Sequence, residues 1–384
     1  MNPPARHAVA ADVVFDGRHR HDNAAVVIEG GHIVALTARA NLPASIEAFN
    51  APPGAWLAPG FIDLQINGGG DVLFNDDPTP EAILTIAAAH RRFGVTGFLP
   101  TLITDSDEKM VAALDAVAVA KTRTPGVLGL HLEGPFLSPE KPGVHRPDLI
   151  RRPLPHHRRM LGGFRAGALL VTLAPEETPD GFIADLVASG AKVALGHSMA
   201  TYAQTCAAMA EGLTGFTHLF NAMRPLTARE PGPVAAALET PGAFYGLIVD
   251  GAHVAPAMLR LAMRGVGRPM LVSDAMPPVG GLSAAFDLQG KSVTVRDDSC
   301  RTQEGALAGS AIGMAQAVRN CVRLLGLPLE RALSFASDAP AHFLGLEHVL
   351  GRLAPGYRAD MAAIDPLEIA VRATWVAGER WENP

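Results

Sequence analysis

The sequence predicts an α/β protein with a (β/α)8 TIM-like barrel and a small β-sandwich domain built from both chain termini. Between about residues 59 and 346, short apolar runs alternate with helical stretches, which is typical of repeated βα units around a parallel sheet. Eight such runs occur, and no glycine-rich dinucleotide or P-loop motif opens a helix. A closed barrel is therefore favoured over an open doubly wound sheet.

Strand-like segments bounded by turns occur at both ends of the chain. The N-terminal ones are 12–15, 25–28 and 32–36, and the C-terminal ones are 361–364 and 373–378. Each end is too small to bury a core alone, so each needs a partner. We expect residues 1–58 and 347–384 to form one small β-domain, and residues 59–346 to form the barrel.

The expected barrel strands follow one another along the central part of the chain. They are residues 61–66, 95–99, 127–132, 169–173, 192–195, 215–217, 244–249 and 270–272. Helices are expected between most of them, for example at 81–93, 107–121, 181–189 and 202–211. Barrel enzymes place their active sites at the carboxyl ends of the strands, so polar residues there are candidates for function.

Composition excludes several classes of protein. The chain has 384 residues, 48% hydrophobic and 18% charged, and a net charge of -6, so it can bury a large core but carries no basic field for nucleic acid or an anionic membrane. No run approaches the ~18 apolar residues of a membrane helix, and no signal peptide is evident. Three cysteines without zinc-site spacing indicate reduced thiols in a cytoplasmic protein. The basic cluster at 156–159 is expected to be a solvated helix face.

Glu133 stands where a buried strand opens into a loop. The stretch 127–137 is VLGLHLEGPFL, and Gly134-Pro135 ends any regular structure. An unpaired carboxylate in this place costs several kcal/mol of desolvation, so a metal ion, a cation or a substrate should balance it.

Other polar residues stand at the same end of the expected strands. They are Asp63, Gln65, Asn67, Glu133, His197, His218, His253 and Asp274. Glu133, His197 and His218 form an oxygen, nitrogen, nitrogen set that suits zinc or another divalent transition metal and leaves one position for water. Asp274 can accept a proton from that water. Hydrogen-bonded core histidines, and an N-cap or salt-bridge role for Asp274, are the plainer alternatives.

Several segments together resemble one known family. They are 59–68 (PGFIDLQING), 131–136 (HLEGPF), 196–198 (GHS), 217–223 (THLFNAM), 229–232 (REPG), 250–254 (DGAHV) and 273–275 (SDA). The chain resembles the N-acetylglucosamine-6-phosphate deacetylases of the amidohydrolase superfamily. The resemblance implies hydrolysis of N-acetylglucosamine 6-phosphate to glucosamine 6-phosphate and acetate, in amino-sugar catabolism and cell-wall sugar recycling.

The resemblance also implies roles for single residues. Glu133, His197 and His218 are expected to bind one divalent metal, zinc before iron, cobalt, manganese or nickel, with Asp274 as general base and acid. His145 is expected to polarise the amide carbonyl, and His253 to contact the sugar. Hydrogen bonds that pack the loops are the alternative for His145 and His253.

Phosphate and acetyl contacts are implied as well. Backbone amides at Asn221 and Ala222 are expected to bind the phosphate, and Ala308, in segment 305–310, to line the acetyl pocket. Arg229 is expected to reach the phosphate in a neighbouring subunit, which implies a homodimer. A surface ion pair with Glu230 is the alternative for Arg229, and a helix-start loop for segment 305–310.

One departure from the wider superfamily bears on the metal count. Many amidohydrolases have a His-x-His pair after the first strand, where this chain has Gln65 and Asn67, and no lysine ends the fourth strand. Amides are poor ligands for transition metals, so one metal is expected, with Asp63 as a further oxygen ligand or a hydrogen-bond partner behind the ligands. Another hydrolase of the superfamily, or an inactive sugar-phosphate sensor, are alternative hypotheses.

Overall fold

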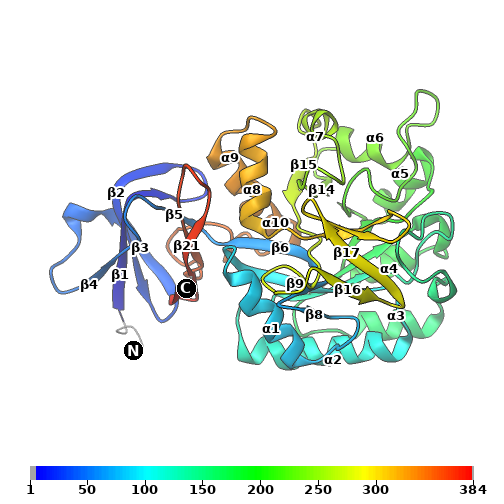
Figure 1. Ribbon diagram of the computed structural model, residues 1–384, viewed down its shortest axis with the longest axis horizontal. Helices are drawn as coiled ribbons and strands as arrows, with labels where there is room; N and C mark the ends of the chain where they lie inside the picture. The colour runs from blue at the N-terminus through cyan, green and yellow to red at the C-terminus, as the bar shows by residue number, and fades with distance from the viewer. Residues whose placement is uncertain (1–5, 383–384) are drawn as a thin grey trace.

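The computed structural model describes residues 6–382. Figure 1 shows strands from both chain ends gathered on one side, next to a larger barrel that contains the middle of the chain. No helix among the described residues is long and apolar enough to cross a lipid bilayer.

Eight parallel strands form the barrel sheet, in the order β15-β14-β13-β12-β11-β10-β9-β6. They are β6 (Phe61–Ile66), β9 (Val95–Ile103), β10 (Gly129–Glu133), β11 (Ala168–Leu173), β12 (Lys192–Leu195), β13 (Gly215–Phe216), β14 (Phe244–Leu247) and β15 (Arg268–Leu271). Every strand expected from the sequence is present, so the predicted barrel is confirmed. Apolar runs locate these strands because both faces of a barrel sheet are covered.

The first and last barrel strands are joined by residues just beyond β15. The N–H of Asn67 donates to the carbonyl of Ala275 (2.9 Å), and the N–H of Ser273 donates to Oδ1 of Asp63 (3.2 Å). Ile66 and Ala275 also form a parallel bridge. Asp274 lies between Ser273 and Ala275 in the sequence. These contacts, which close the barrel, therefore place Asp274 beside the end of the first strand.

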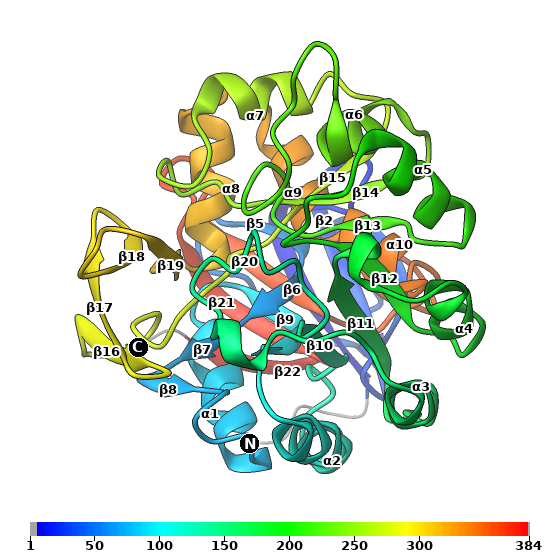
Figure 2. The same cartoon turned by 90° about the vertical axis from the view of Figure 1, so that its right-hand side faces the viewer.

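Helices surround the sheet, as the view along the barrel in Figure 2 shows. They are α1 (Pro80–Arg91), α2 (Asp107–Arg123), α3 (Pro155–Gly162), α4 (Phe182–Ala188), α5 (Tyr202–Ala210), α6 (Gly232–Glu239), α7 (Pro256–Ala262), α8 (Met314–Arg323), α9 (Leu329–Ala336) and α10 (Asp338–Leu344). Thr79, Ser106 and Thr201 cap α1, α2 and α5 through their side chains, which satisfies N–H groups in the first turn.

Strands from the two chain ends form one sheet, in the order β22-β21-β20-β5-β1-β2-β3, with β4 beside β1. These strands are β1 (Arg6–Phe15), β2 (Arg20–Glu29), β3 (His32–Ala38), β4 (Glu47–Asn50), β5 (Trp56–Pro59), β20 (Met361–Ile364), β21 (Val371–Val376) and β22 (Glu379–Glu382). The antiparallel pair β5–β20 joins the two ends. The expected partnership of the termini is confirmed, while domain boundaries after residue 58 and before residue 347 stay a prediction.

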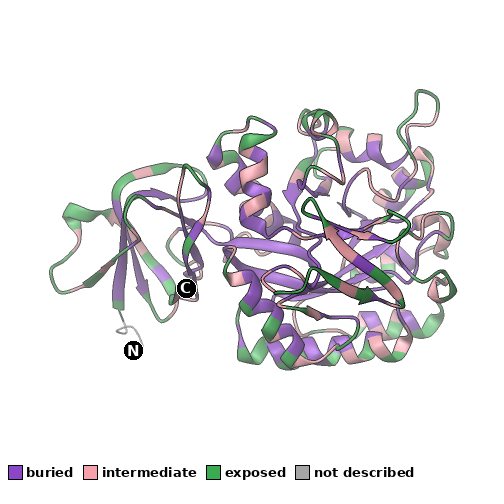
Figure 3. Ribbon diagram, in the orientation of Figure 1, coloured by how far each residue is buried: buried purple, intermediate pink, exposed green. Residues whose placement is uncertain are grey.

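The sheet of the termini and the barrel share a hydrophobic core. Phe15, Ala58 and Val371 belong to the same buried cluster as Phe61 and Val95 of the barrel. Figure 3 shows the barrel strands buried and the outward faces of the helices exposed. The sheet therefore packs on the barrel rather than hanging from it by a linker.

A four-stranded antiparallel sheet follows β15 and was not expected from the sequence. It consists of β16 (Ala285–Leu288), β17 (Lys291–Arg296), β18 (Ser299–Thr302) and β19 (Leu307–Ser310), and it lies at the barrel rim in Figure 2. Two-residue turns with positive φ, at Gln289-Gly290 and Asp297-Asp298, close its first two hairpins. Such turns are the usual hairpin signal, although neither has the favoured Asn-Gly or Asp-Gly sequence. A short ribbon of β7 (Gly68–Gly69) and β8 (Val72–Leu73) lies nearby.

Trp375 in β21 tests how much the sheet of the termini contributes to stability. Its side chain is only 2% exposed and packs among residues from both chain ends. Trp375→Ala is expected to lower the free energy of unfolding by about 3–5 kcal/mol, as loss of a buried aromatic side chain does. Denaturant titration measures this, with Trp381→Ala as control because Trp381 in β22 is partly exposed. Equal losses in the two variants would contradict a core position for Trp375.

Candidate active site

A cavity of about 370 Å³ opens at the carboxyl ends of the barrel strands. Its volume is in the range of small-molecule sites. The residues predicted for function that line it are Asn67, Glu133, His145, His197, His218, Asn221, Ala222, His253 and Asp274. Side chains separated by more than 200 positions in the sequence thus face one space.

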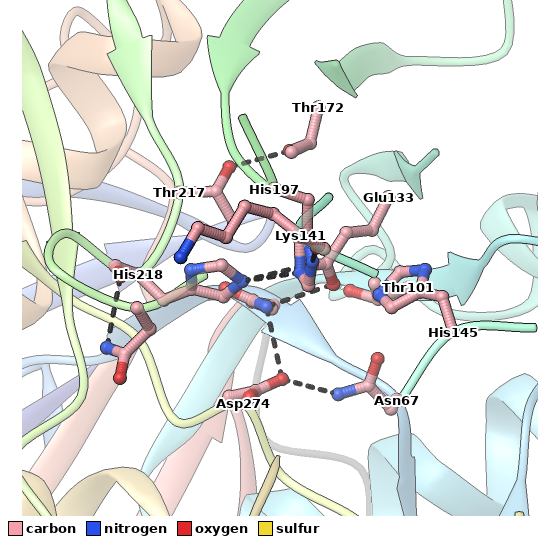
Figure 4. A network of polar contacts seen from close by, with 12 residues as sticks. Asn67, Thr101, Glu133, Lys141, His145, Thr172, His197, Thr217, His218 and Asp274 are labelled. Atoms are coloured by element: carbon pink, nitrogen blue, oxygen red, sulfur yellow. Dashed lines mark hydrogen bonds and ion pairs between the residues drawn. The ribbon is translucent and has the colours of Figure 1, made fainter. Parts of the chain in front are cut away.

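Glu133, His197 and His218 converge at the base of this cavity (Figure 4). The Nε2 atoms of His197 and His218 lie 3.1 and 2.8 Å from Oε1 of Glu133, and 3.2 Å from each other. All three residues are at most 5% exposed. Ligand atoms around a tetrahedral zinc ion, with bonds of about 2.0–2.1 Å, lie about 3.3 Å apart. The three side chains are thus already spaced closely enough to share one ion.

A hydrogen bond behind His197 decides which nitrogen of its ring faces the cavity. Nδ1 of His197 lies 2.8 Å from the carbonyl oxygen of Lys141, and a carbonyl can only accept, so Nδ1 carries the proton. In the neutral ring, Nε2 of His197 therefore presents a lone pair on the side that faces Glu133 and His218. A divalent cation can accept such a lone pair, as in metal sites where a carbonyl fixes the outer nitrogen of the ligand. The residues present fit a divalent metal ion.

The charges of Glu133, His197 and His218, called the triad below, also favour a cation at this point. Burial raises the pKa of Glu133, but the adjacent imidazoles of His197 and His218 outweigh it and hold that pKa well below its usual value. For His218, burial lowers the pKa, yet the Glu133 carboxylate raises it above the ordinary value overall. The carboxylate therefore remains ionised and attracts positive charge to this point.

Three of the site residues occupy the left-handed region of backbone conformation. His197 has φ 49°, His218 has φ 32° and Asp274 has φ 51°. This conformation costs a residue with a side chain about 1–3 kcal/mol and persists where the surrounding structure enforces it, often at functional sites. Each of the three follows a barrel strand directly or within three residues, so the strain accompanies the turn of the chain into the cavity.

Two amide side chains from the first strand hold the carboxylates. Nδ2 of Asn67 donates to Oδ1 of Asp274 (2.7 Å), and Nε2 of Gln65 donates to the same oxygen and to Oε2 of Glu133 (3.1 Å each). Burial and the charge of Glu133 raise the pKa of Asp274. Gln65 and Asn67 therefore act as hydrogen-bond donors that orient two carboxylates.

Asp63 lies behind the cavity rather than in it. It is completely buried, and its Oδ1 accepts the N–H groups of Gln65 and Ser273, each at 3.2 Å. Burial raises its pKa to about 7. Asp63 thus closes the barrel seam beside Asp274, in line with a hydrogen-bonding role behind the ligands.

The two further histidines expected to contact substrate both face the cavity. The ring of His145 packs on that of His197, with centroids 4.4 Å apart. Nδ1 of His253 lies 2.6 Å from Oδ2 of Asp250. Asp250 was not among the residues predicted for function, although its position three residues before a loop histidine is a signal for such a pair. Asp250 orients His253, whose Nε2 remains for a ligand.

The turn at Asn221 and Ala222 differs in one respect from the expectation. Ala222 has φ 46°, and both residues line the cavity. However, the backbone N–H of Asn221 donates to the carbonyl of His218 (2.9 Å), and its side-chain amide donates there too (3.1 Å). The N–H groups of Asn221 therefore stabilise the turn, and an anion would have to compete with these bonds.

Arg229 and Ala308 lie outside the cavity of their own chain. Arg229 is exposed on the loop between α5 and α6. Among the described residues Arg229 forms no ion pair with Glu230, whose Oε1 accepts the N–H groups of Tyr202 (2.8 Å) and Gly232 (3.1 Å). Ala308 is fully buried in an apolar cluster, and its neighbours Leu307 and Gly309 line the cavity in its place.

A second cluster of Asp107, His156 and His157 has close ligand atoms but is not suited to a metal. Nδ1 of His157 accepts the N–H of Leu154 (2.8 Å), so the proton of a neutral ring is on Nε2, which points at Asp107. Arg151 also pairs with Asp107. The expectation of a fully solvated face at 156–159 is wrong for His157, which is buried because it caps α3 and binds Asp107.

Comparison with known proteins agrees with this geometry. The amidohydrolase family model matches residues 56–382. An N-acetylgalactosamine-6-phosphate deacetylase of Shewanella sp. ANA-3 is 43% identical over 84% of this chain and 82% of its own. An N-acetylglucosamine-6-phosphate deacetylase of Haemophilus influenzae is 34% identical over 94% and 95%. The crystal structure of N-acetylglucosamine-6-phosphate deacetylase from Pasteurella multocida superposes with a TM-score of 0.95, at 35% identity, covering 98% of this chain and 100% of the other. The chain therefore belongs to the amidohydrolase family.

Proposed function

We propose that this enzyme hydrolyses the acetamide of N-acetyl-D-glucosamine 6-phosphate to D-glucosamine 6-phosphate and acetate, in amino-sugar catabolism and cell-wall sugar recycling. The observation that carries the proposal is the convergence of Glu133, His197 and His218 beside Asp274 in one cavity. Relatives that match most of the chain are named as deacetylases of phosphorylated amino sugars.

One divalent ion, zinc in our proposal, is held by Glu133, His197 and His218. Such an ion lowers the pKa of a water molecule and polarises an amide carbonyl. Asp274 takes a proton from the attacking water and returns it to the nitrogen as the C–N bond breaks. Gln65 and Asn67 hold Asp274 in place for both transfers.

Recognition of the sugar phosphate is assigned to the cavity rim. His253, oriented by Asp250, contacts the sugar, and His145 donates to the acetamide carbonyl. The turn at Asn221 and Ala222 faces the phosphate, and Arg229 of a second copy in a homodimer completes its binding. An arginine fork suits a phosphate dianion. We place the protein in the cytoplasm, where the free thiols of Cys206, Cys300 and Cys321 stay reduced.

N-acetylgalactosamine 6-phosphate is a second candidate substrate, because the relative at 43% identity is named for it. Acetate release from the two sugar phosphates and from unphosphorylated N-acetylglucosamine tests the assignment. We expect the highest kcat/KM with N-acetylglucosamine 6-phosphate. A preference for the galactose epimer would change the substrate, and equal hydrolysis of the unphosphorylated sugar would remove the phosphate site.

The metal ligands are tested by Glu133→Ala. Loss of this carboxylate is expected to reduce bound metal well below one ion per chain, because two neutral imidazoles are left to hold a dication. Elemental analysis of dialysed protein measures this. Glu140→Ala is the matched control, since Glu140 lines the same cavity but is exposed and outside the triad. Unchanged metal in Glu133→Ala would refute the ligand assignment.

Asp274→Asn tests the proton-transfer step. Turnover is expected to fall by about 10² to 10⁴, because an amide cannot accept the proton of water at neutral pH. Bound metal is expected to stay near the wild-type level, which elemental analysis checks on the same sample. Full activity in this variant would exclude Asp274 from the mechanism.

Sharing of Arg229 between subunits is tested by mixing two inactive variants. Arg229→Ala and Asp274→Asn chains, co-refolded or co-expressed, form hybrid dimers with one intact site. Activity is then expected to recover to roughly a quarter of wild type for random pairing. Hybrid dimers without recovered activity would show that Arg229 acts within its own chain or not at all.

A further inference from the structure

Thr104 lies at the carboxyl end of the second barrel strand, immediately after β9, where the sequence analysis assigned no functional residue. Its Oγ1 lies 2.8 Å from Nδ1 of His145, and its backbone N–H donates to the same ring nitrogen at 3.3 Å. Thr104 is 1% exposed and His145 2%. The contact is therefore shielded from water and comes from one residue through two different groups.

These two contacts define where His145 carries its proton. A backbone N–H can only donate, so the Nδ1 atom that it faces must present a lone pair. A doubly protonated ring, or one with its proton on Nδ1, would place two hydrogens against each other. The proton is therefore on Nε2, on the opposite edge of the ring, and the Thr104 hydroxyl also donates to Nδ1.

We propose that Thr104 is a positioning residue that holds His145 as the Nε2–H tautomer, so that His145 can donate a hydrogen bond to the acetamide carbonyl oxygen. The inference rests on the proposed function for the identity of the acceptor. The tautomer itself follows from the geometry alone. Without Thr104, a neutral imidazole is free to rotate or to exchange its two tautomers, and the donor in the cavity is lost for part of the time.

The surrounding chain keeps room for this contact. A Cβ atom on Gly134 would lie 2.2 Å from Oγ1 of Thr104, which is too close. Gly134 also has φ +91°, a backbone conformation that disfavours any residue with a side chain. The glycine of the segment His131-Leu132-Glu133-Gly134 thus lets the Thr104 hydroxyl approach His145. This gives that glycine a second role besides the turn after Glu133.

The β16–β17 hairpin fastens both partners. Nε2 of Gln289, in its turn, donates to the carbonyl of Thr104 (2.9 Å). Nζ of Lys291, at the start of β17, donates to the carbonyl of Val144 (3.0 Å), the residue before His145. The loops that carry Thr104 and His145 therefore both hydrogen-bond to one hairpin. These bonds hold the His145 ring next to the Thr104 hydroxyl.

Nitrogen-15 NMR of the zinc-loaded protein with labelled histidine rings reads the tautomer directly. The His145 signals are assigned by their disappearance in His145→Gln. We expect an unprotonated, hydrogen-bonded Nδ1 and a protonated Nε2. A proton on Nδ1 in the wild-type protein would overturn the proposal, whether or not the protein releases acetate from N-acetylglucosamine 6-phosphate. Absence of acetate release would count against the proposed function instead.

Thr104→Val and Thr104→Ser separate the hydroxyl from the shape of the side chain. Loss of one hydrogen bond corresponds to about 2- to 10-fold, and we expect this loss in kcat with KM little changed, because the bond orients a catalytic donor. In Thr104→Val the Nδ1 resonance is expected to shift toward that of a nitrogen with a weaker hydrogen bond. Thr104→Ser is expected to restore both readouts.

Two results would contradict the role of the hydroxyl. One is a Thr104→Val variant with wild-type kcat and an unmoved Nδ1 resonance. The other is a Thr104→Ser variant as impaired as Thr104→Val, because serine retains the donor. Thr104→Ala provides a second variant without the hydroxyl should valine prevent folding, and the same shift in resonance is expected of it.

Discussion

The buried carboxylate of Glu133 is the constraint on which the rest of the site depends. A charge at the end of an apolar strand is stable only when positive charge faces it, because water is largely excluded there. Both His197 and His218 direct Nε2 at its Oε1, and the carboxylate raises the pKa of His218. A closed barrel makes this possible, because it brings the ends of β10, β12 and β13 to the same end of the barrel although these strands are distant in the sequence.

The amides of Gln65 and Asn67 show how the first strand orients the carboxylates of the cavity. A side-chain amide is a weak ligand for a transition metal but a good donor to a carboxylate. Here both amides donate to Asp274, and Gln65 also donates to Glu133. These two strand positions thus hold the carboxylates of Asp274 and Glu133 in fixed orientations.

Elements that carry no catalytic group still determine the shape of the site. The sheet of the chain termini shares a hydrophobic core with the barrel, through residues such as Phe15 and Val371, and so packs against the barrel strands. The β16–β19 sheet holds the loops of Thr104 and His145 through Gln289 and Lys291. Asp250 fixes His253 in the same manner. Second partners of this kind orient the groups that meet a ligand.

The sequence by itself determined the barrel, its strands and the identity of the groups at their ends. Apolar runs locate barrel strands because both faces are covered, and the barrel rule then places Glu133, His197, His218 and Asp274 together. The pairing of the two chain ends was also predictable, since neither buries a core alone.

Only the tertiary structure decided which partner each polar group binds. The use of the Asn221 N–H in a turn, the bond of Thr104 to His145 and the burial of Ala308 depend on loop conformation. The hairpins of β16–β19 close through Gln289-Gly290 and Asp297-Asp298, whose positive φ values are not visible in the residue types alone. Strand positions follow from hydrophobic periodicity, which is local, whereas hydrogen-bond direction is set by groups distant in the sequence that folding brings within about 3 Å.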